Sequence, residues 1–242
     1  MRLDIYLTEN GLVSSRTEAK SFISIGAVRV DGEIVTKPSY AVVGEPLIEL
    51  DKSSKKYVSR GGLKLEAALD AFDISVEDLM AVDIGASSGG FTDCLLQRGA
   101  RSVIALDSGT AQLTESIRRD KRVISLENFN ARYMTPHDLS YVPDIAVMDV
   151  SFISATLIMP AVLEVLKPGG SFVCLIKPQF EVGRKNVGKG GIVKDEKIRL
   201  QAVNSVIDFA RGLGFTPVAF IQSPIIGGDG NVEFLAHFKK ES

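Results

Sequence analysis

The 242-residue sequence has no excess of positive charge and no long apolar run. It contains 28 Lys and Arg against 30 Asp and Glu, so composition alone gives no sign of nucleic-acid binding, although a local basic patch could still provide it. Cys94 and Cys174 stand singly in apolar stretches, which favours buried small side chains over a metal site or a disulfide. With neither a run of eighteen apolar residues nor a signal-peptide core, we expect a cytoplasmic protein that does not cross a membrane.

Residues 1–54 have the pattern of a small α+β domain. Ser14 or Ser15 can cap a short helix, and Gly26 can end that helix in a left-handed turn. The alternation in AVRVDGEIV, centred on Asp31-Gly32, predicts a β-hairpin, and EPLIEL is typical of a short closing strand. We expect residues 55–61, within a polar and basic stretch, to be a linker.

Residues 62–242 alternate between apolar strand patterns and helical patterns, which predicts an α/β fold around a mostly parallel sheet. Helical patterns fill most of the gaps between strands. The last two strands are joined by a loop rich in Pro and Gly, so we expect the C-terminal strand to be antiparallel. The predicted strands are Ala81–Gly85, Ser102–Asp107, Arg122–Glu127, Asp144–Val150, Ser171–Lys177, Thr216–Ser223 and Val232–Phe238.

The stretch VDIGASSGGFTDCLL runs from a strand through a glycine-rich turn into a helix. Ligands of open α/β sheets bind beyond the carboxyl ends of the strands, where this turn lies. An acid at Asp83, before the first glycine, is typical of many methyltransferases, and Asp107 ends the next strand, where a carboxylate can bind ribose hydroxyls. Nicotinamide binding is the alternative, but its G-x-G-x-x-G spacing is not present here. Phe91 either packs under the cofactor or anchors the helix.

Four charged residues occupy positions where a fold of this kind usually has apolar ones. Asp149 and Lys177 end apolar strands, Glu233 lies inside the run VEFLAHF, and Lys64 lies in an amphipathic helix after the linker. Each alone could be a structural ion pair or a lysine that reaches solvent. Together they suit methylation of a ribose 2′-hydroxyl, which must be held in line with the methyl donor and lose its proton to a base such as a neutral lysine.

These residues resemble the Lys-Asp-Lys-Glu tetrad of the FtsJ/RrmJ-like rRNA 2′-O-methyltransferases, and the N-terminal segment resembles the S4 RNA-binding fold. The order of MRLDIYL, KYVSRGGLKL, DVSFIS and IKPQFE is similar to that of the TlyA family over essentially the whole chain. The resemblance implies a Rossmann-like methyltransferase sheet, the cofactor S-adenosylmethionine, and cytidine 2′-O-methylation in ribosomal RNA or ribosomal subunits. Members of this family are often labelled haemolysins.

The resemblance also implies roles for individual residues. Lys177 corresponds to the base, Lys64 to a residue that positions the hydroxyl, and Glu233 to one that fixes the lysines. Asp149 corresponds to a residue close to both the methyl donor and the lysines. The expected cofactor-binding residues are Asp83, Gly85, Ser87, Gly89, Gly90, Phe91, Asp107, Asn130 and Asp149.

The candidate phosphate contacts are basic residues of the N-terminal segment and the linker. Arg16 and Lys20 are four residues apart and therefore share a helix face, although an ordinary solvated face is the alternative. The glycine- and lysine-rich segment 180–195 either closes over RNA or is a flexible surface loop. The full set of expected RNA-binding residues is Arg2, Arg16, Lys20, Arg29, Lys55, Lys56 and Arg60.

Three other functions compete with an RNA methyltransferase. A membrane-active haemolysin would need a strongly amphipathic cationic helix, a membrane-spanning helix or a secretion signal, and the sequence shows none of these patterns. A non-catalytic ribosome assembly factor would have no use for the four charged residues. A small-molecule methyltransferase would leave the S4-like segment without a role.

Overall fold

The computed structural model describes residues 1–242 except 14, 25, 52–55, 228–229 and 242. The chain forms two compact units, Met1–Arg60 and Gly61–Ser242. The predicted linker, residues 55–61, includes the junction between them.

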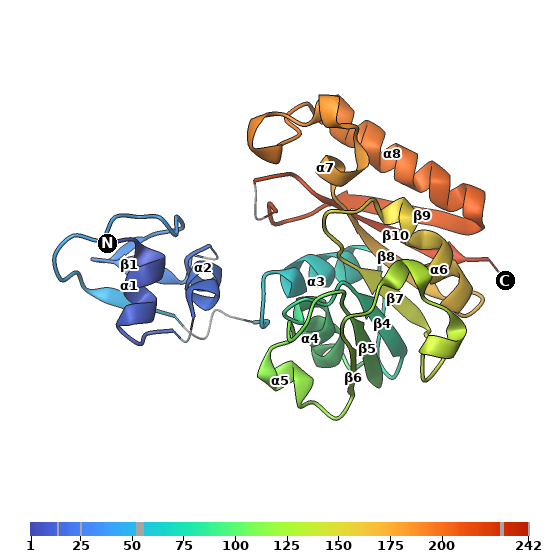
Figure 1. Ribbon diagram of the computed structural model, residues 1–242, viewed down its shortest axis with the longest axis horizontal. Coiled ribbons are helices and arrows are strands. Elements are labelled where there is room, and N and C mark those ends of the chain that lie inside the picture. The colour runs from blue at the N-terminus through green and yellow to red at the C-terminus, as the bar shows by residue number, and fades with distance from the viewer. Residues whose placement is uncertain (14, 25, 52–55, 228–229, 242) are drawn as a thin grey trace. The chain divides into compact units, whose positions relative to one another are not determined.

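The N-terminal unit packs two short helices against a three-stranded sheet of order β2-β1-β3 (Figure 1). As predicted, Ser15 caps the second helix, because its Oγ accepts a hydrogen bond of 3.2 Å from the Glu18 N–H. The expected hairpin is also present, and its turn residues Asp31 and Gly32 have φ values of 51° and 83°, as a type I′ turn requires. The elements are α1 (Leu3–Glu9), α2 (Arg16–Ser24), β1 (Val28–Val30), β2 (Glu33–Ile34) and β3 (Ile48–Leu50).

The larger unit contains a seven-stranded sheet of order β6-β5-β4-β7-β8-β10-β9, in which β10 is antiparallel to both of its neighbours and the other pairings are parallel. This confirms the predicted topology. Its strands are β4 (Met80–Ile84), β5 (Ser102–Leu106), β6 (Val123–Leu126), β7 (Ile145–Met148), β8 (Ser171–Ile176), β9 (Phe215–Gln222) and β10 (Phe234–Lys240). Its α-helices are α3 (Gly61–Ala71), α4 (Gly90–Gln97), α5 (Glu115–Arg118), α6 (Met159–Val165), α7 (Pro178–Glu181) and α8 (Glu196–Leu213).

The side chains of each strand alternate between the two faces of this sheet, so both faces are apolar, and helices cover both of them. On β10, Ala236 and Phe238 join the apolar core that also contains residues of α6 and α8, whereas His237 points to the other face and stacks on Phe72, just after α3. Figure 1 shows α8 running along β9 and β10. Between β6 and β7 the chain forms two 3-10 turns, at Ala131–Tyr133 and Pro136–Asp138, and no α-helix.

Several of the predicted site residues lie just outside the strands, whereas Asp83 lies inside β4 and Lys64 lies in α3. Asp107 directly follows β5, Asp149 directly follows β7 and Lys177 directly follows β8. Glu233 precedes β10 rather than lying inside it. The strand order reverses between β4 and β7, so the carboxyl ends of these two strands form the topological switch point at which such sheets bind ligands.

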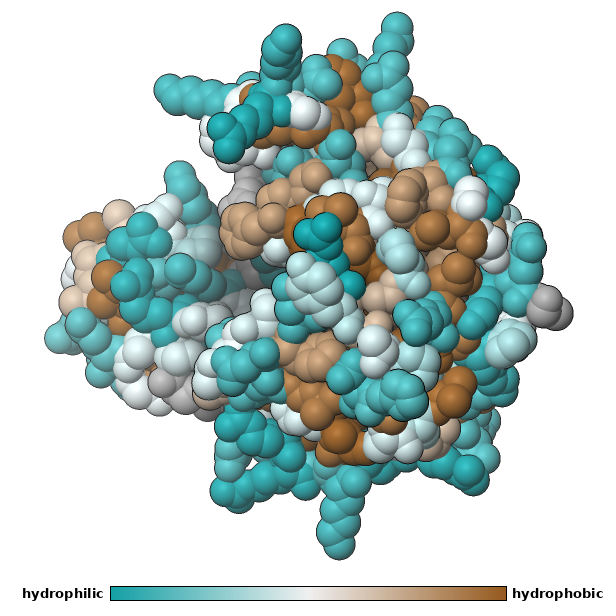
Figure 2. All heavy atoms as spheres, turned by 45° about the vertical axis from the view of Figure 1, so that its right-hand side comes forward, coloured by the Kyte–Doolittle hydropathy of each residue, from teal (hydrophilic) through white to brown (hydrophobic). Residues whose placement is uncertain are grey.

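In the described part of the chain, no helix has both the length and the apolar character needed to cross a membrane. On the face of the molecule in Figure 2, hydrophobic residues form separate groups among hydrophilic ones. Surface composition therefore does not mark a site on this face.

Candidate active site

A cavity of about 420 Å³ lies at the switch point. It is lined by residues that follow β4, β5 and β7, together with the segment after β6. The polar side chains and apolar surfaces around it suit a nucleoside-sized ligand. Five of the predicted cofactor residues line this cavity, namely Gly85, Ser87, Asp107, Asn130 and Asp149.

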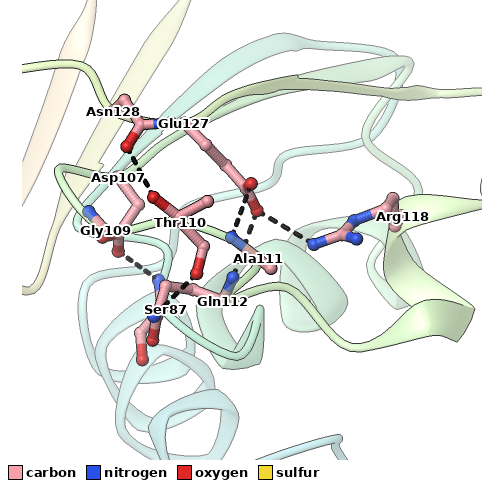
Figure 3. A network of polar contacts seen from close by, with 9 residues as sticks. All are labelled: Ser87, Asp107, Gly109, Thr110, Ala111, Gln112, Arg118, Glu127 and Asn128. Carbon is pink, nitrogen blue, oxygen red and sulfur yellow. Dashed lines mark hydrogen bonds and ion pairs between the residues drawn. The ribbon is translucent and has the colours of Figure 1, made fainter.

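Asp107 is held rigidly at the cavity wall (Figure 3). Its two carboxylate oxygens accept hydrogen bonds of 2.7 Å from the backbone N–H groups of Ser87 and Gly109. A carboxylate oxygen can accept more than one hydrogen bond, so both oxygens can still accept one from a ligand hydroxyl. The loop that begins at Asp107 and the glycine-rich turn are thus joined at the cavity wall.

Glu127, at the end of β6, holds the other end of this loop (Figure 3). Its carboxylate accepts hydrogen bonds of 2.7 Å from the Ala111 N–H, 3.2 Å from the Gln112 N–H and 3.0 Å from the Arg118 guanidinium. The Ala111 hydrogen bond is the main cause that lowers the pKa of Glu127 below its usual value. Gln112 lines the cavity, so Glu127 shapes the site without lining it.

Gly85 is required by close backbone contact. Its φ is +84°, and a Cβ there would lie 2.4 Å from the carbonyl oxygen of Asp149. Any side chain would therefore push apart the carboxyl ends of β4 and β7. Gly89, with a φ of +94°, precedes α4 and has Ile117 and Leu113 nearby. Gly89, Gly90 and Phe91 are buried but do not line the cavity, so the geometry favours the helix-anchoring role for Phe91.

Asp83 is fully buried behind the turn. Its Oδ2 accepts a hydrogen bond of 2.6 Å from the Thr92 hydroxyl, and its Oδ1 has no partner among the described residues. Burial raises the pKa of this carboxyl to about 7. A buried acceptor without a partner is costly in an empty protein and suits a site that binds a polar or cationic ligand group.

The raised pKa of Asp83 predicts a pH-dependent stability. In the folded protein the carboxyl keeps its proton up to about pH 7, whereas in the unfolded chain it loses the proton near pH 3.9. The folded state therefore binds more protons between these values, and the contribution of Asp83 to the unfolding free energy falls by about 4 kcal/mol as the pH rises through them.

Asp83→Asn tests this expectation, because the amide does not titrate. Unfolding free energies of both proteins should be measured by urea denaturation from pH 4.5 to 8. The unfolding free energy of the wild type should fall relative to that of the variant as the pH rises. A difference that is constant with pH would contradict the assignment.

Lys177 and Asp149 form an ion pair at the edge of the cavity. The Lys177 Nζ lies 2.6 Å from Asp149 Oδ1 and donates a hydrogen bond of 2.7 Å to the Ser151 hydroxyl. The lysine side chain is 10% exposed and that of Asp149 is 23% exposed. Asp149 lines the cavity, so it connects a cofactor-sized space to a nearly buried amine.

Lys64 and Glu233 form a second and more deeply buried pair. Lys64 Nζ lies 2.5 Å from Glu233 Oε2, and their side chains are 10% and 4% exposed. The register of β10 against β8 pairs Phe234 with Ile176, so Glu233 and Lys177 are the next residues at the adjoining strand ends. A Cβ at Gly227 would lie 2.5 Å from Glu233 Oε1, so this glycine leaves room for the carboxylate.

Sequence reasoning missed three residues around these pairs. Ser151 contacts Lys177, and Phe152 is 89% exposed at the cavity with a φ of +65°. Asn231 is buried, and its amide bonds to the Val193 N–H and the Gly191 carbonyl, which ties down the segment 180–195. The positive φ of Phe152 leaves no signal in the sequence, and neither serine nor asparagine is unusual in a loop.

The predicted RNA-binding residues lie on the N-terminal unit. Arg2 and Arg16 both bond to the buried carboxylate of Asp4, and the Arg2 hydrogen bond is the main cause that lowers the pKa of Asp4 to about 2. Arg2 and Arg16 nevertheless remain 46% and 55% exposed. Lys20, Arg29 and Lys56 are exposed and Arg60 is half-buried, whereas Lys55 lies outside the described residues.

The strand order, the antiparallel β10 and the cavity after β4 define a Rossmann-like methyltransferase domain. A solved S-adenosylmethionine-dependent methyltransferase from Mesorhizobium loti has the same fold, with a TM-score of 0.53, 16% identity, and coverage of 72% of this chain and 96% of that one. Residues 57–240 match the FtsJ-like methyltransferase family and residues 1–45 match the S4 domain. The chain belongs to the FtsJ-like methyltransferase family and carries an N-terminal S4 domain.

Close relatives extend over the whole chain. The 16S/23S rRNA (cytidine-2'-O)-methyltransferase TlyA of Mycobacterium tuberculosis is 42% identical over 242 residues, which are 100% of this chain and 90% of that protein. A solved protein from Streptococcus thermophilus, which carries a hemolysin name, is 45% identical with a TM-score of 0.80 and covers 100% of this chain and 89% of that chain. The family resemblance predicted from the motifs is confirmed.

Proposed function

We propose that this protein transfers a methyl group from S-adenosylmethionine to a ribose 2′-hydroxyl, that of a cytidine, in ribosomal RNA. The observation that carries the proposal is the position of Asp149, which lines the cavity and pairs with Lys177. A methyl donor in the cavity would then lie next to a lysine that can serve an acceptor hydroxyl. The name of the M. tuberculosis relative supports the same reaction, and with ribosomal RNA as substrate the protein would act in the cytoplasm.

The residues around the cavity fit the cofactor. Asp107 is placed to accept hydrogen bonds from its ribose hydroxyls, and Asn130 and Gln112 lie on the wall that would enclose its nucleoside. Asp83 does not line the cavity, but its buried and unpartnered Oδ1 behind the glycine-rich turn suits the amino group of the methionine part. When bound, S-adenosylmethionine supplies a methyl group on a positively charged sulfur.

The two ion pairs suit the acceptor side of the reaction. Methyl transfer forms an O–C bond and breaks the S–C bond, so the hydroxyl must also lose its proton. Lys177, in its neutral form, is placed to take that proton, and Asp149 fixes the lysine beside the cavity. Lys64, held by Glu233, would hold the same hydroxyl from the α3 side. Phe152 offers an exposed ring at the cavity on which a base can stack.

A labelling experiment distinguishes this proposal from the haemolysin alternative. The purified protein is incubated with S-adenosylmethionine labelled in its methyl group and with separated ribosomal subunits, and in a second arm with red blood cells alone. We expect label in the ribose of ribosomal RNA and no lysis. Label in the bases would refute the ribose assignment, and lysis without cofactor or RNA would favour the haemolysin.

The S4 domain is expected to supply phosphate contacts through its basic residues. Lys20→Gln should weaken RNA binding and reduce the slope of log affinity against log salt by about one, while the affinity for S-adenosylmethionine is unchanged. Filter binding at several salt concentrations and calorimetry measure the two quantities.

Arg16→Gln is the informative comparison. It should weaken RNA binding in the same way, and it should also lower the unfolding free energy because buried Asp4 loses one of its partners. A salt slope that neither variant changes would mean that this helix face does not contact phosphates. An equal loss of cofactor affinity would indicate damage to the fold.

A further inference from the structure

Two motifs of the sequence, DVSFIS at 149–154 and IKPQFE at 176–181, face each other in the structure. Lys177 bonds to Asp149 and Ser151, and the ring of Phe180 packs on that of Phe152 with centroids 5.3 Å apart. Contacts therefore run along the whole length of the two motifs, although the proposed reaction by itself accounts for only Asp149, Lys177 and Phe152.

The neutral amine of Lys177 has two N–H donors and one lone pair that can accept a proton, so three directions around its nitrogen are open to partners. The geometry assigns one to Asp149 Oδ1 at 2.6 Å and one to Ser151 Oγ at 2.7 Å, which leaves a third direction for a substrate oxygen. A single carboxylate would leave a long lysine side chain free to rotate about the contact. The Ser151 hydroxyl is a second acceptor, and it fixes the orientation of the Lys177 nitrogen and therefore of its remaining direction.

The loop that carries Ser151 is also held at the C-terminal ends of the two motifs. Glu181, on α7, accepts hydrogen bonds of 2.5 Å from the Ser154 hydroxyl and 2.8 Å from the Ala155 N–H. The left-handed backbone at Phe152, unusual for an aromatic residue, is kept in place between these contacts and the Lys177 bond. Ser151 is exposed, and its bond to Lys177 and the contacts of Glu181 hold the loop that carries its hydroxyl.

We propose that Ser151 is a positioning residue for the methyl transfer, which orients the Lys177 amine toward the ribose hydroxyl. The inference rests on the proposed function. It predicts that loss of the Ser151 hydroxyl affects the rate of the chemical step more than the binding of either substrate. Threonine at the same position retains an acceptor hydroxyl and should restore the rate.

The test compares Ser151→Ala and Ser151→Thr with wild type and with Ser205→Ala, in which an exposed hydroxyl on α8 is removed. Ribose label from S-adenosylmethionine into ribosomal RNA gives kcat and the KM of each substrate, and calorimetry gives the cofactor affinity. We expect kcat of Ser151→Ala to fall about 10- to 100-fold, while both KM values and the affinity for the cofactor, whose cavity Ser151 lines, change by less than about fivefold. Ser151→Thr should recover most of the rate, and Ser205→Ala should match wild type.

Two outcomes would overturn the inference while leaving the proposed function intact. In the first, wild type labels ribose and Ser151→Ala does so at the same kcat. In the second, Ser151→Ala loses cofactor affinity as strongly as rate and threonine does not rescue it, which would mark a structural role. If wild type itself labels bases and no ribose, the proposed function fails and the role of Ser151 fails with it.

Discussion

Replacing Lys177 by methionine is expected to lower the rate of ribose methylation by about 10²- to 10⁴-fold, the usual contribution of a positioned general base. Methionine keeps the length and apolar body of the side chain but has no nitrogen to accept a proton. Single-turnover transfer of labelled methyl to ribosomal RNA measures the effect, because it isolates the chemical step from product release.

The matching control is Lys167→Met, which also removes a lysine paired with a carboxylate. Lys167 pairs with Asp144. Both residues precede their strands, β8 and β7, at the edge of the sheet opposite to the proposed site, and the Lys167 side chain is 52% exposed. Lys167→Met should therefore retain the wild-type rate. Lys177 does not line the cavity, so Lys177→Met should bind S-adenosylmethionine within a few-fold of wild type. Full activity of Lys177→Met would rule out the lysine as the base.

Glu233→Leu is expected to lower the unfolding free energy by about 3–5 kcal/mol, because it leaves the charge of Lys64 buried and unpaired. The large effect comes from the removal of one partner rather than from a strong net contribution of the pair. Denaturant unfolding measures it, with ribose methylation as a second readout because both residues belong to the proposed site.

The double variant Lys64→Met/Glu233→Leu separates these two causes. It removes both charges and should recover most of the lost stability while remaining inactive. Glu115→Gln serves as the surface control, since its pair with Arg119 is largely exposed and should contribute less than about 1 kcal/mol. Equal stability of the single and double variants would contradict the burial argument.

Much of the fold could be predicted because its signals are local. The cap at Ser15, the turn at Asp31-Gly32 and the apolar strands depend on residues close together in the sequence. Strand ends were less accurate, and Glu233 was placed inside a strand that begins one residue later. The segment between β6 and β7 forms turns, because backbone and side-chain bonds such as those of Thr135 with Asp138 replace a helix there.

The residues of the site could be predicted better than their partners. Charged residues at the ends of apolar strands stand out in the sequence, and this identified Asp149 and Lys177. The pairing of Lys64 with Glu233 joins residues 169 positions apart and depends on how α3 packs beside β10. For Phe91 the sequence leaves a cofactor contact and a helix anchor open, with the helix anchor favoured, and its burial agrees with the helix anchor.

The position of the methyl group in the product tests the central claim most directly. A 2′-O-methyl group removes the hydroxyl that attacks the neighbouring phosphodiester in alkali. Ribosomal RNA treated with the protein and S-adenosylmethionine should therefore show one or more gaps in an alkaline hydrolysis ladder, each at a cytidine, and Lys177→Met should give a continuous ladder. A continuous ladder with the wild-type protein, from RNA that has nevertheless incorporated labelled methyl, would contradict the ribose assignment.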